Sequence, residues 1–317
     1  MSNLARLVVI LGPTASGKSA LGISLAERLG GEILVCDSTQ VYRHFNIGTA
    51  KVPLAEQRGI PHHLVDLVEP NEVFTAGEYR RRALKVLEDV RRRGKIPILT
   101  AGTGLYLRSL LEGLADAPER SEELRARLRR NAARHGLEYL HRVLARLDRE
   151  AATRIAPRDT QKIIRAIEIR VIGGRPVGEI HRSGRSGLEG YDIRKIGLLP
   201  ARAKLYARID TRVHQMIEAG WANEVRDLVR SGVPDDAKPF QFIGYSELRA
   251  QVGSGRIPTG TIAQIQQATR RFAKRQITWF RKESDVHWLN GFGDDPDVLV
   301  AALDIAQASN PKDLTPR

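Results

Sequence analysis

The sequence contains little sulfur and no long apolar segment near its start. With one cysteine and two methionines among 317 residues, the chain can form neither an internal disulfide nor a cysteine-rich metal site. The apolar run at residues 7–11 is too short for a signal peptide or a membrane span. The eight histidines also lack the spacing of metal ligands. These absences predict a cytoplasmic enzyme.

The charge of the chain is strongly one-sided. Lys and Arg number 51 against 37 Asp and Glu, a formal net charge of +14. Residues 118–190 and 191–290 carry +7 each, whereas residues 1–117 carry +3 and residues 291–317 carry −3. Because Lys and Arg supply the sequence-independent attraction to nucleic acid, this excess predicts a large polyanionic partner. A merely solubilising basic surface is the alternative.

Short apolar segments alternate with amphipathic ones in the first third of the sequence. Residues 7–11, 32–36 and 96–100 are typical of buried strands, while residues 18–29 and 76–93 have helical periodicity. This alternation predicts an α/β fold whose parallel sheet is covered by helices. Ligands of such folds bind at the carboxyl ends of the strands.

The segment GPTASGKS, residues 12–19, matches the phosphate-loop pattern G-x-x-x-x-G-K-[ST], with a strand before it and a helix after it. Its backbone N–H groups can cradle an anion, Lys18 supplies a cation, and the Ser19 hydroxyl can hold Mg²⁺. The loop is typical of nucleotide-binding and ATP-binding proteins. However, the strand segment PILTAGTG ends without the acid of a Walker B strand. The sequence therefore predicts phosphate binding in a P-loop NTPase-like core, but not NTP hydrolysis.

The pattern changes after Pro118, where apolar residues recur at helical spacing and Ser121 and Asp159 can serve as N-caps. We therefore expect a mostly helical insertion domain. The expected divisions are a first part of the core at 1–117, the insertion at 118–190, a second part of the core at 191–290 with a basic helix at 259–284, and a peripheral tail at 291–317.

Asp37 ends the apolar run ILVC at the expected carboxyl end of the second strand. It should face the same crevice as the phosphate loop. A Mg²⁺ ligand of the Walker B type, the acceptor-binding base of a small-molecule kinase and a base for another nucleophile are all compatible with this place. A structural cap or turn before Ser-Thr is a fourth possibility. The residues alone leave these four open.

The segment from Thr261 to Lys282 places its basic residues on one side of a helix. Six of them fall within an arc of about 140° on a helical wheel, and these are Arg270, Arg271, Lys274, Arg275, Arg281 and Lys282. In the insertion, Lys162 and Arg165 lie one turn apart. Two basic surfaces favour contact with nucleic acid, whereas a single one is often only a solvated helix face.

Six segments in order resemble one known family. They are GPTASGKS at 12–19, DSTQVYR at 37–43, IGTAK at 47–51, AGTGLYL at 101–107, QKIIRAIE at 161–168 and AKRQITWF at 273–280. The combination is similar to bacterial tRNA dimethylallyltransferases and covers residues 7–290. The family's more usual GGTGLY appears here as AGTGLY, and its QR appears as QK at Lys162.

This resemblance implies transfer of a dimethylallyl group from dimethylallyl diphosphate to N6 of the adenosine on the 3′ side of the anticodon. Diphosphate leaves, and Mg²⁺ is the expected cofactor. Asp37 is then the base, Thr103 a hydrogen-bonding partner near the reacting centre, and Lys18 a cation for the leaving group. The expected diphosphate site comprises Gly12, Pro13, Thr14, Ala15, Ser16, Gly17, Lys18, Ser19 and Arg212, with Ser19 as the metal ligand.

The resemblance also implies a surface for the anticodon stem-loop of tRNA, whose target base must leave its stack to react. The expected contacts are Asp37, Ser38, Thr39, Gln40, Thr103, Arg125, Gln161, Lys162, Ile163, Ile164, Arg165, Phe242, Lys274, Arg275 and Gln276. Phe240, Phe242 and Trp279 are candidates for stacking on bases. We expect a monomer that does not bind membranes.

Three alternative functions would use some of the same residues. A P-loop small-molecule kinase would use the loop and Asp37, but it leaves the basic excess unexplained. An adenylate isopentenyltransferase would share the fold and the chemistry but accept a free nucleotide. An NTP-dependent RNA-binding switch would change its RNA affinity with nucleotide and modify nothing covalently.

Overall fold

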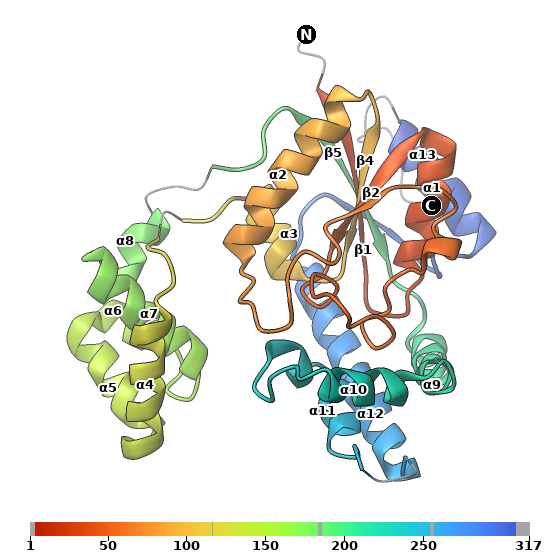
Figure 1. The fold of residues 1–317 in the computed structure, drawn as a ribbon. Coiled ribbons are helices and arrows are strands. Elements are labelled where there is room, and N and C mark those ends of the chain that lie inside the picture. The colour runs from red at the N-terminus through yellow and green to blue at the C-terminus, as the bar shows by residue number, and fades with distance from the viewer. Residues whose placement is uncertain (1–3, 116, 183–185, 254–256, 309–317) are drawn as a thin grey trace. The chain divides into compact units, whose positions relative to one another are not determined.

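A six-stranded parallel sheet lies at the centre of the larger part of the molecule (Figure 1). The computed structural model describes residues 4–115, 117–182, 186–253 and 257–308. The strand order is β3-β2-β4-β1-β5-β6, and every neighbouring pair is parallel. The strands are β1 (Ala5–Leu11), β2 (Gly31–Cys36), β3 (His62–His63), β4 (Ile96–Ala101), β5 (Tyr191–Leu198) and β6 (Val286–Leu289). The expected α/β fold with a parallel sheet is confirmed.

Helices cover both faces of the sheet because its central strands are apolar on both sides. Figure 1 shows α1 (Lys18–Leu29) and α13 (Pro296–Gln307) on one face, where they share a core with Val8, Ile10 and Ile33. On the other face lie α2 (Ala76–Arg92) and α3 (Gly104–Leu111). The ring of Tyr79 in α2 stacks on Tyr106 of α3, with centroids 4.6 Å apart.

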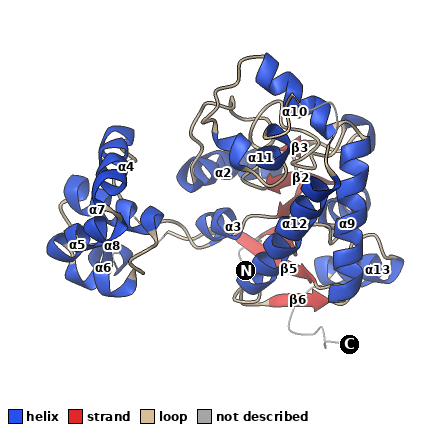
Figure 2. Ribbon diagram, turned by 90° about the horizontal axis from the view of Figure 1, so that it is seen from below, coloured by secondary structure: helices blue, strands red, loops and turns tan. Residues whose placement is uncertain are grey.

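Four helices lie between β5 and β6 in the described residues, and they are α9 (Arg202–Glu218), α10 (Trp221–Arg230), α11 (Tyr245–Arg249) and α12 (Thr259–Phe280). A short 3₁₀ turn at Lys238–Gln241 precedes α11, and another at Leu54–Glu56 precedes β3. Gly220, at a φ of 96°, separates α9 from α10. Figure 2 shows α9 and α12 side by side. Although α12 has 22 residues, no helix in the described ranges is long and apolar enough to cross a membrane.

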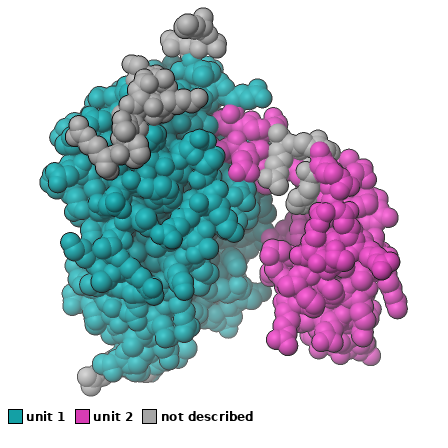
Figure 3. All heavy atoms as spheres, turned by 180° about the vertical axis from the view of Figure 1, so that it is seen from behind, with its two compact units in different colours: residues 1–110, 189–317 teal, residues 111–188 magenta. Residues whose placement is uncertain are grey.

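Residues Leu111–Leu188 form a second compact unit, coloured separately in Figure 3. Its helices are α4 (Glu122–His135), α5 (Leu137–Leu147), α6 (Arg149–Arg154), α7 (Thr160–Gly173) and α8 (Val177–Arg182). Leu128, Leu140, Leu144 and Ile163 belong to one core cluster that these helices enclose. The Ser121 side chain accepts a hydrogen bond from the N–H of Leu124 and so caps α4, as expected.

A buried carboxylate links the helices of this second unit. Glu168 is fully buried on α7 and accepts hydrogen bonds from Arg125 Nε (2.9 Å) and Nη2 (2.8 Å). It also accepts from Arg165 Nη1 (2.6 Å) and from the N–H of Ser121 (2.7 Å). Burial acts to raise the pKa of Glu168, but these hydrogen bonds outweigh it and lower the pKa to about 2. Glu168 is therefore charged at neutral pH.

The structure divides the chain differently from the sequence expectation. The second unit runs from Leu111 to Leu188, whereas the expected insertion was 118–190. The expected peripheral tail at 291–317 is wrong for the described residues 291–308, because α13 packs into the main core through Val298, Ala302 and Ile305. Residues 309–317 lie outside the described ranges. The short β3, α3 and α13 were not expected as separate elements.

Replacing Glu168 by Ala is expected to destabilise the protein by about 3–5 kcal/mol, because Arg125 stays buried without a counter-charge. Urea unfolding followed by circular dichroism measures the change. Glu150→Ala is the matched control, since Glu150 pairs with Arg154 in an exposed i,i+4 arrangement worth less than about 1 kcal/mol. Equal changes in the free energy of unfolding would show that the buried network stabilises the protein no more than the exposed ion pair does.

Candidate active site at the phosphate loop

The phosphate loop connects β1 to α1 at the carboxyl edge of the sheet. Ala15 and Gly17 both have positive φ, 62° and 89°. Gly12 leaves room for the Ser16 side chain, since a Cβ there would lie 2.9 Å from Ser16 Oγ. Ser16 Oγ is buried and has no hydrogen-bond partner among the described residues. A hydroxyl of this kind can donate to an anion in the loop.

Lys18 folds back over the loop that precedes it. Its Nζ donates to the carbonyl oxygens of Gly12 (2.9 Å) and Pro13 (2.8 Å). Burial lowers the pKa of Lys18 to about 8; the carboxylate of Asp37 opposes this change, and the guanidinium of Arg212 on α9 adds to it. Asp37 and Arg212 therefore both lie within electrostatic reach of Lys18.

Asp37 follows β2 and lies beside the residues that follow β4. Its Oδ1 accepts hydrogen bonds from the N–H (2.8 Å) and the hydroxyl (2.7 Å) of Thr39. Thr103 Oγ1 accepts from the N–H of Ser38 (2.9 Å) and lies 3.2 Å from Ser38 Oγ. A Cβ on Gly102 would come within 2.4 Å of Asp37 Oδ2. Any larger residue at this position would therefore displace the carboxylate.

Gln276 on α12 connects the phosphate loop with the loop that follows β4. Its Oε1 accepts from the N–H of Thr14 in the phosphate loop (2.7 Å), and its Nε2 donates to the carbonyl of Gly102 (2.7 Å). The residue is 7% exposed. Gln276 therefore faces the interior of the site rather than the outer surface of α12.

The segment after β6 packs against the phosphate loop from outside. The N–H of Gly293 donates to the carbonyl of Ser16 (2.9 Å). Arg208 of α9 forms an ion pair with Asp294 (2.7 Å), and its guanidinium lies 4.6 Å from the centre of the Phe292 ring. Nothing in the sequence pattern indicated that this distant segment supports the loop.

The outer surface of α12 combines cations with an aromatic ring. A shallow hollow of about 230 Å³ is lined by Lys274, Arg275, Thr278, Trp279 and Lys282. The Trp279 side chain is 38% exposed, and the Arg108 guanidinium of α3 lies 5.1 Å from its ring centre. The expected basic surface of this helix is therefore present for these residues, whereas Arg270 pairs with Asp210 of α9.

Comparison with known proteins shows the family of the chain. A family model described as IPP transferase matches residues 40–283. This chain belongs to the IPP transferase family. A protein named tRNA dimethylallyltransferase from Solibacter usitatus is 48% identical over 94% of this chain and 97% of its own length, and one from Koribacter versatilis is 48% identical over 96% and 98%.

Solved structures of the IPP transferase family have the same fold. A tRNA isopentenylpyrophosphate transferase from Bacillus halodurans superposes with a TM-score of 0.69 at 35% identity and covers 95% of both chains. A eukaryotic dimethylallyltransferase described as acting on tRNA superposes with a TM-score of 0.77 at 27% identity. It covers 96% of this chain and 76% of that one. The resemblance expected from the sequence motifs is thus confirmed.

In this member of the IPP transferase family, the second unit presents only part of the expected RNA surface. Gln161 and Lys162 are exposed, and Lys162 pairs with Asp159 (2.6 Å). Arg165 is partly exposed and donates to the Pro118 carbonyl (2.9 Å) as well as to Glu168.

Three residues of the expected RNA surface in the second unit are buried instead. Ile163 and Ile164 belong to the core of the unit, and Arg125 is 6% exposed and paired with Glu168. Their expected RNA contacts are therefore corrected to structural roles. The family motif QKIIR groups these residues together without separating those that face RNA from those that face the core.

A hydrogen bond and aromatic packing hold the residues that follow Asp37. Gln40 Nε2 donates to the carbonyl of Thr49 (3.1 Å). Phe242 is partly buried, with its ring centre 5.7 Å from that of Tyr42. Phe240 is 3% exposed and packs edge-on against Phe45, so it cannot stack on a base. Trp279 and Phe242 remain candidates for that role.

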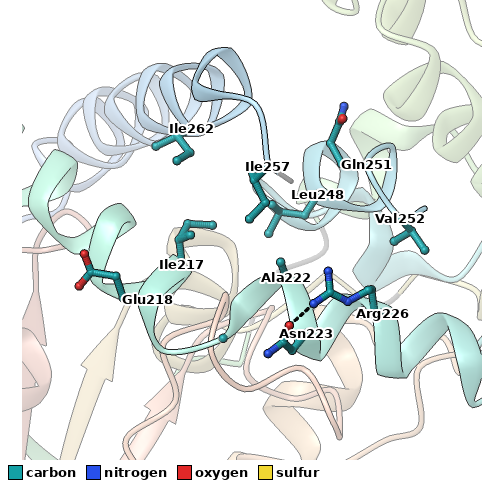
Figure 4. Close-up of a pocket in the computed structure, with 11 residues that line it drawn as sticks. Ile217, Glu218, Ala222, Asn223, Arg226, Leu248, Gln251, Val252, Ile257 and Ile262 are labelled. Atoms are coloured by element: carbon teal, nitrogen blue, oxygen red, sulfur yellow. Dashed lines mark hydrogen bonds between the residues drawn. The ribbon is translucent and has the colours of Figure 1, made fainter. Parts of the chain in front are cut away.

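A second hollow, of about 360 Å³, lies among α9, α10, α11 and α12 (Figure 4). Ile217, Leu248, Ile257 and Ile262 provide much of its apolar lining, and Asn223 accepts a hydrogen bond from Arg226 at its rim. No residue expected in the active site lines it. The larger hollow is therefore distinct from the phosphate loop.

The affinity for inorganic diphosphate is expected to be highest below pH 8 and to fall by up to about tenfold per unit as the pH rises further. The reason is that the anion binds the charged form of Lys18, whose pKa is about 8. Isothermal titration calorimetry between about pH 7 and pH 9.5 measures this dependence.

The control for this titration is Lys18→Gln. It keeps a hydrogen-bond donor but has no titrating amine, and ionisation of diphosphate itself affects both proteins equally. The difference in affinity between the two proteins should shrink above pH 8. A difference that stays constant over the whole range would assign the titration to another group.

Proposed function

We propose that this protein is a tRNA dimethylallyltransferase, which moves a dimethylallyl group from dimethylallyl diphosphate to N6 of the adenosine on the 3′ side of the anticodon. The observation that carries the proposal is the meeting of a phosphate loop, Asp37 and Thr103 at one sheet edge. Its relatives named tRNA dimethylallyltransferase, 48% identical, support the same substrate class.

The phosphate loop would serve a leaving group rather than a phosphate to be transferred. As the allylic C–O bond breaks, its electron pair departs with the diphosphate, and negative charge grows on the diphosphate oxygens. Lys18, Arg212 and the amides at the start of α1 can stabilise that charge. No attacking water takes part, which fits a β4 strand that is followed by Gly102 and Thr103 rather than by an acid.

The acceptor side would use the residues after β2 and β4. The N6 lone pair of adenine is delocalised, so the amine gains from losing a proton as its new bond to carbon forms. The Asp37 carboxylate takes that proton. Thr103 and Ser38 are hydrogen-bonded to each other, and the hydroxyl of Thr39 donates to this carboxylate.

The residues present fit a Mg²⁺ ion held mainly by the substrate. Ser19 is exposed in the first turn of α1, where its hydroxyl can ligate a cation that also binds diphosphate. The described residues offer no cluster of three His, Cys, Asp or Glu, and Mg²⁺ commonly uses few protein ligands together with phosphate oxygens and water. When bound, Mg²⁺ would neutralise charge on the diphosphate.

The RNA would be held by exposed charged and polar side chains of α12 and α7. Lys274 and Arg275 are exposed on α12, and Gln161 and Lys162 are exposed on α7. The target adenine must leave its stack to approach Asp37, and Trp279 and Phe242 are suited to stacking on bases. We propose that the protein does this as a monomer in the cytoplasm.

Incubation with tRNA, Mg²⁺ and dimethylallyl diphosphate is expected to add one dimethylallyl group to an adenosine of the tRNA. Mass analysis of the digested nucleosides detects it. Asp37→Asn should lower turnover by about 10²–10⁴-fold and leave tRNA affinity nearly unchanged, because the amide keeps the shape of the side chain but accepts no proton. A reaction with ATP alone, or with free adenylate instead of tRNA, would support the kinase or the adenylate enzyme.

Arg275→Ala is expected to weaken tRNA binding. Because one phosphate contact is lost, the slope of log K against log[salt] should become shallower by about 1. Filter binding at several salt concentrations measures the slope. Lys85→Ala provides a control in which an exposed cation of α2 is removed. If the two variants show the same slope, Arg275 does not contact a phosphate.

A further inference from the structure

Both ends of the Gln276 side-chain amide are hydrogen-bonded within the active site. Its oxygen accepts from the N–H of Thr14 at 2.7 Å, and its nitrogen donates to the carbonyl of Gly102 at 2.7 Å. We propose that Gln276 is a positioning residue that fixes the distance between the leaving-group side and the acceptor side of the reaction. This inference rests on the proposed function and replaces the expected RNA contact of Gln276.

The orientation of Gln276 separates it from the neighbouring cations of its helix. Lys274 and Arg275 are exposed, whereas Gln276 is 7% exposed. One turn of α12 therefore carries RNA-facing cations on its outer side and a buried amide on its inner side. A residue buried in this way cannot reach a phosphate of the RNA backbone.

The Gly102 end of the bridge leads directly to the acceptor side. The N–H groups of Gly102 and Thr103 both donate to the carbonyl of Cys36 at 3.0 Å. Gly102 is also the residue whose missing Cβ leaves room for Asp37 Oδ2. A shift of the Gly102 carbonyl therefore moves Thr103 and changes the space around Asp37.

The Thr14 end leads to the leaving-group side. Thr14 follows Pro13, whose carbonyl accepts from Lys18 Nζ at 2.8 Å. The N–H of Thr14 donates to Gln276, so it is not one of the amides that face the diphosphate. The bridge thus holds the loop next to the lysine that stabilises the leaving group.

A neutral amide of this length suits the bridge for a chemical reason. Thr14 offers a donor and Gly102 an acceptor, and a primary amide supplies the complement of both. A carboxylate in its place would face the Gly102 carbonyl with a second acceptor and would add negative charge beside a diphosphate site. Alkyl transfer needs reacting atoms about 3–3.5 Å apart, and a displacement of about 1 Å can cost about 10²-fold in rate.

The test compares Gln276→Met and Gln276→Glu with Gln266→Met. Gln266 is the matched control because it lies on the same helix and donates a single hydrogen bond to the backbone of Asp210 (3.2 Å), away from the loop. We expect both Gln276 variants to lower kcat by about 10–100-fold. The KM and Kd for tRNA should stay within about twofold, as should all constants of Gln266→Met.

The pH dependence of Gln276→Glu gives a readout that a purely structural role would not move. A protonated carboxyl has one donor and one acceptor, like the amide, so the loss of kcat relative to wild type should shrink as the pH falls. A loss that is independent of pH would contradict the proposal. Weaker tRNA binding with unchanged kcat would also overturn it and make Gln276 an RNA contact.

Failure of this inference can be distinguished from failure of the proposed function. An active wild-type enzyme whose Gln276 variants keep full kcat refutes only the positioning role. If wild type transfers nothing, hydrogen exchange still tests the bridge, because Gln276→Met should speed exchange in residues 12–17 while Gln266→Met should not. If Gln276→Met does not fold, Gln276→Glu carries the comparison, since it has nearly the same shape.

Discussion

Parallel pairing of β2, β4 and β1 is the constraint on which the candidate site depends. Parallel strands place their carboxyl ends at one edge of a sheet, so the loops after these three strands must meet there. The phosphate loop, Asp37 and Thr103 occupy those three loops. A change in the order of the strands would separate the phosphate loop from Asp37 and Thr103 even if every side chain were kept.

Contacts from the second half of the chain then fix the geometry of that edge. Gln276 joins two of the loops, Gly293 bonds to Ser16, and Arg212 lies within electrostatic reach of Lys18. These residues come from α12, from the segment after β6 and from α9. The geometry of this edge thus depends on α9, α12 and the segment after β6 as well as on β1, β2 and β4.

The sequence predicted those parts of the protein that depend on local pattern. The strands at 7–11, 32–36 and 96–100 and the helices at 18–29 and 76–93 agree with β1, β2, β4, α1 and α2 within a few residues, because periodicity and flanking turns are local properties. The phosphate loop could be predicted for the same reason, since its glycines and Lys18 lie within one segment of eight residues. Family motifs connected these pieces to a single activity.

Tertiary structure decided which side of each element faces inward and what it meets there. The sequence treated Arg125, Ile163, Ile164 and Gln276 as contacts for RNA, but packing buries all four. It also left α13 at the periphery, although apolar side chains of that helix complete the core. A motif records which residues occur together, whereas burial depends on neighbours that are distant in sequence. The buried pair of Glu168 and Arg125 and the bridge of Gln276 therefore emerge only once the chain has folded.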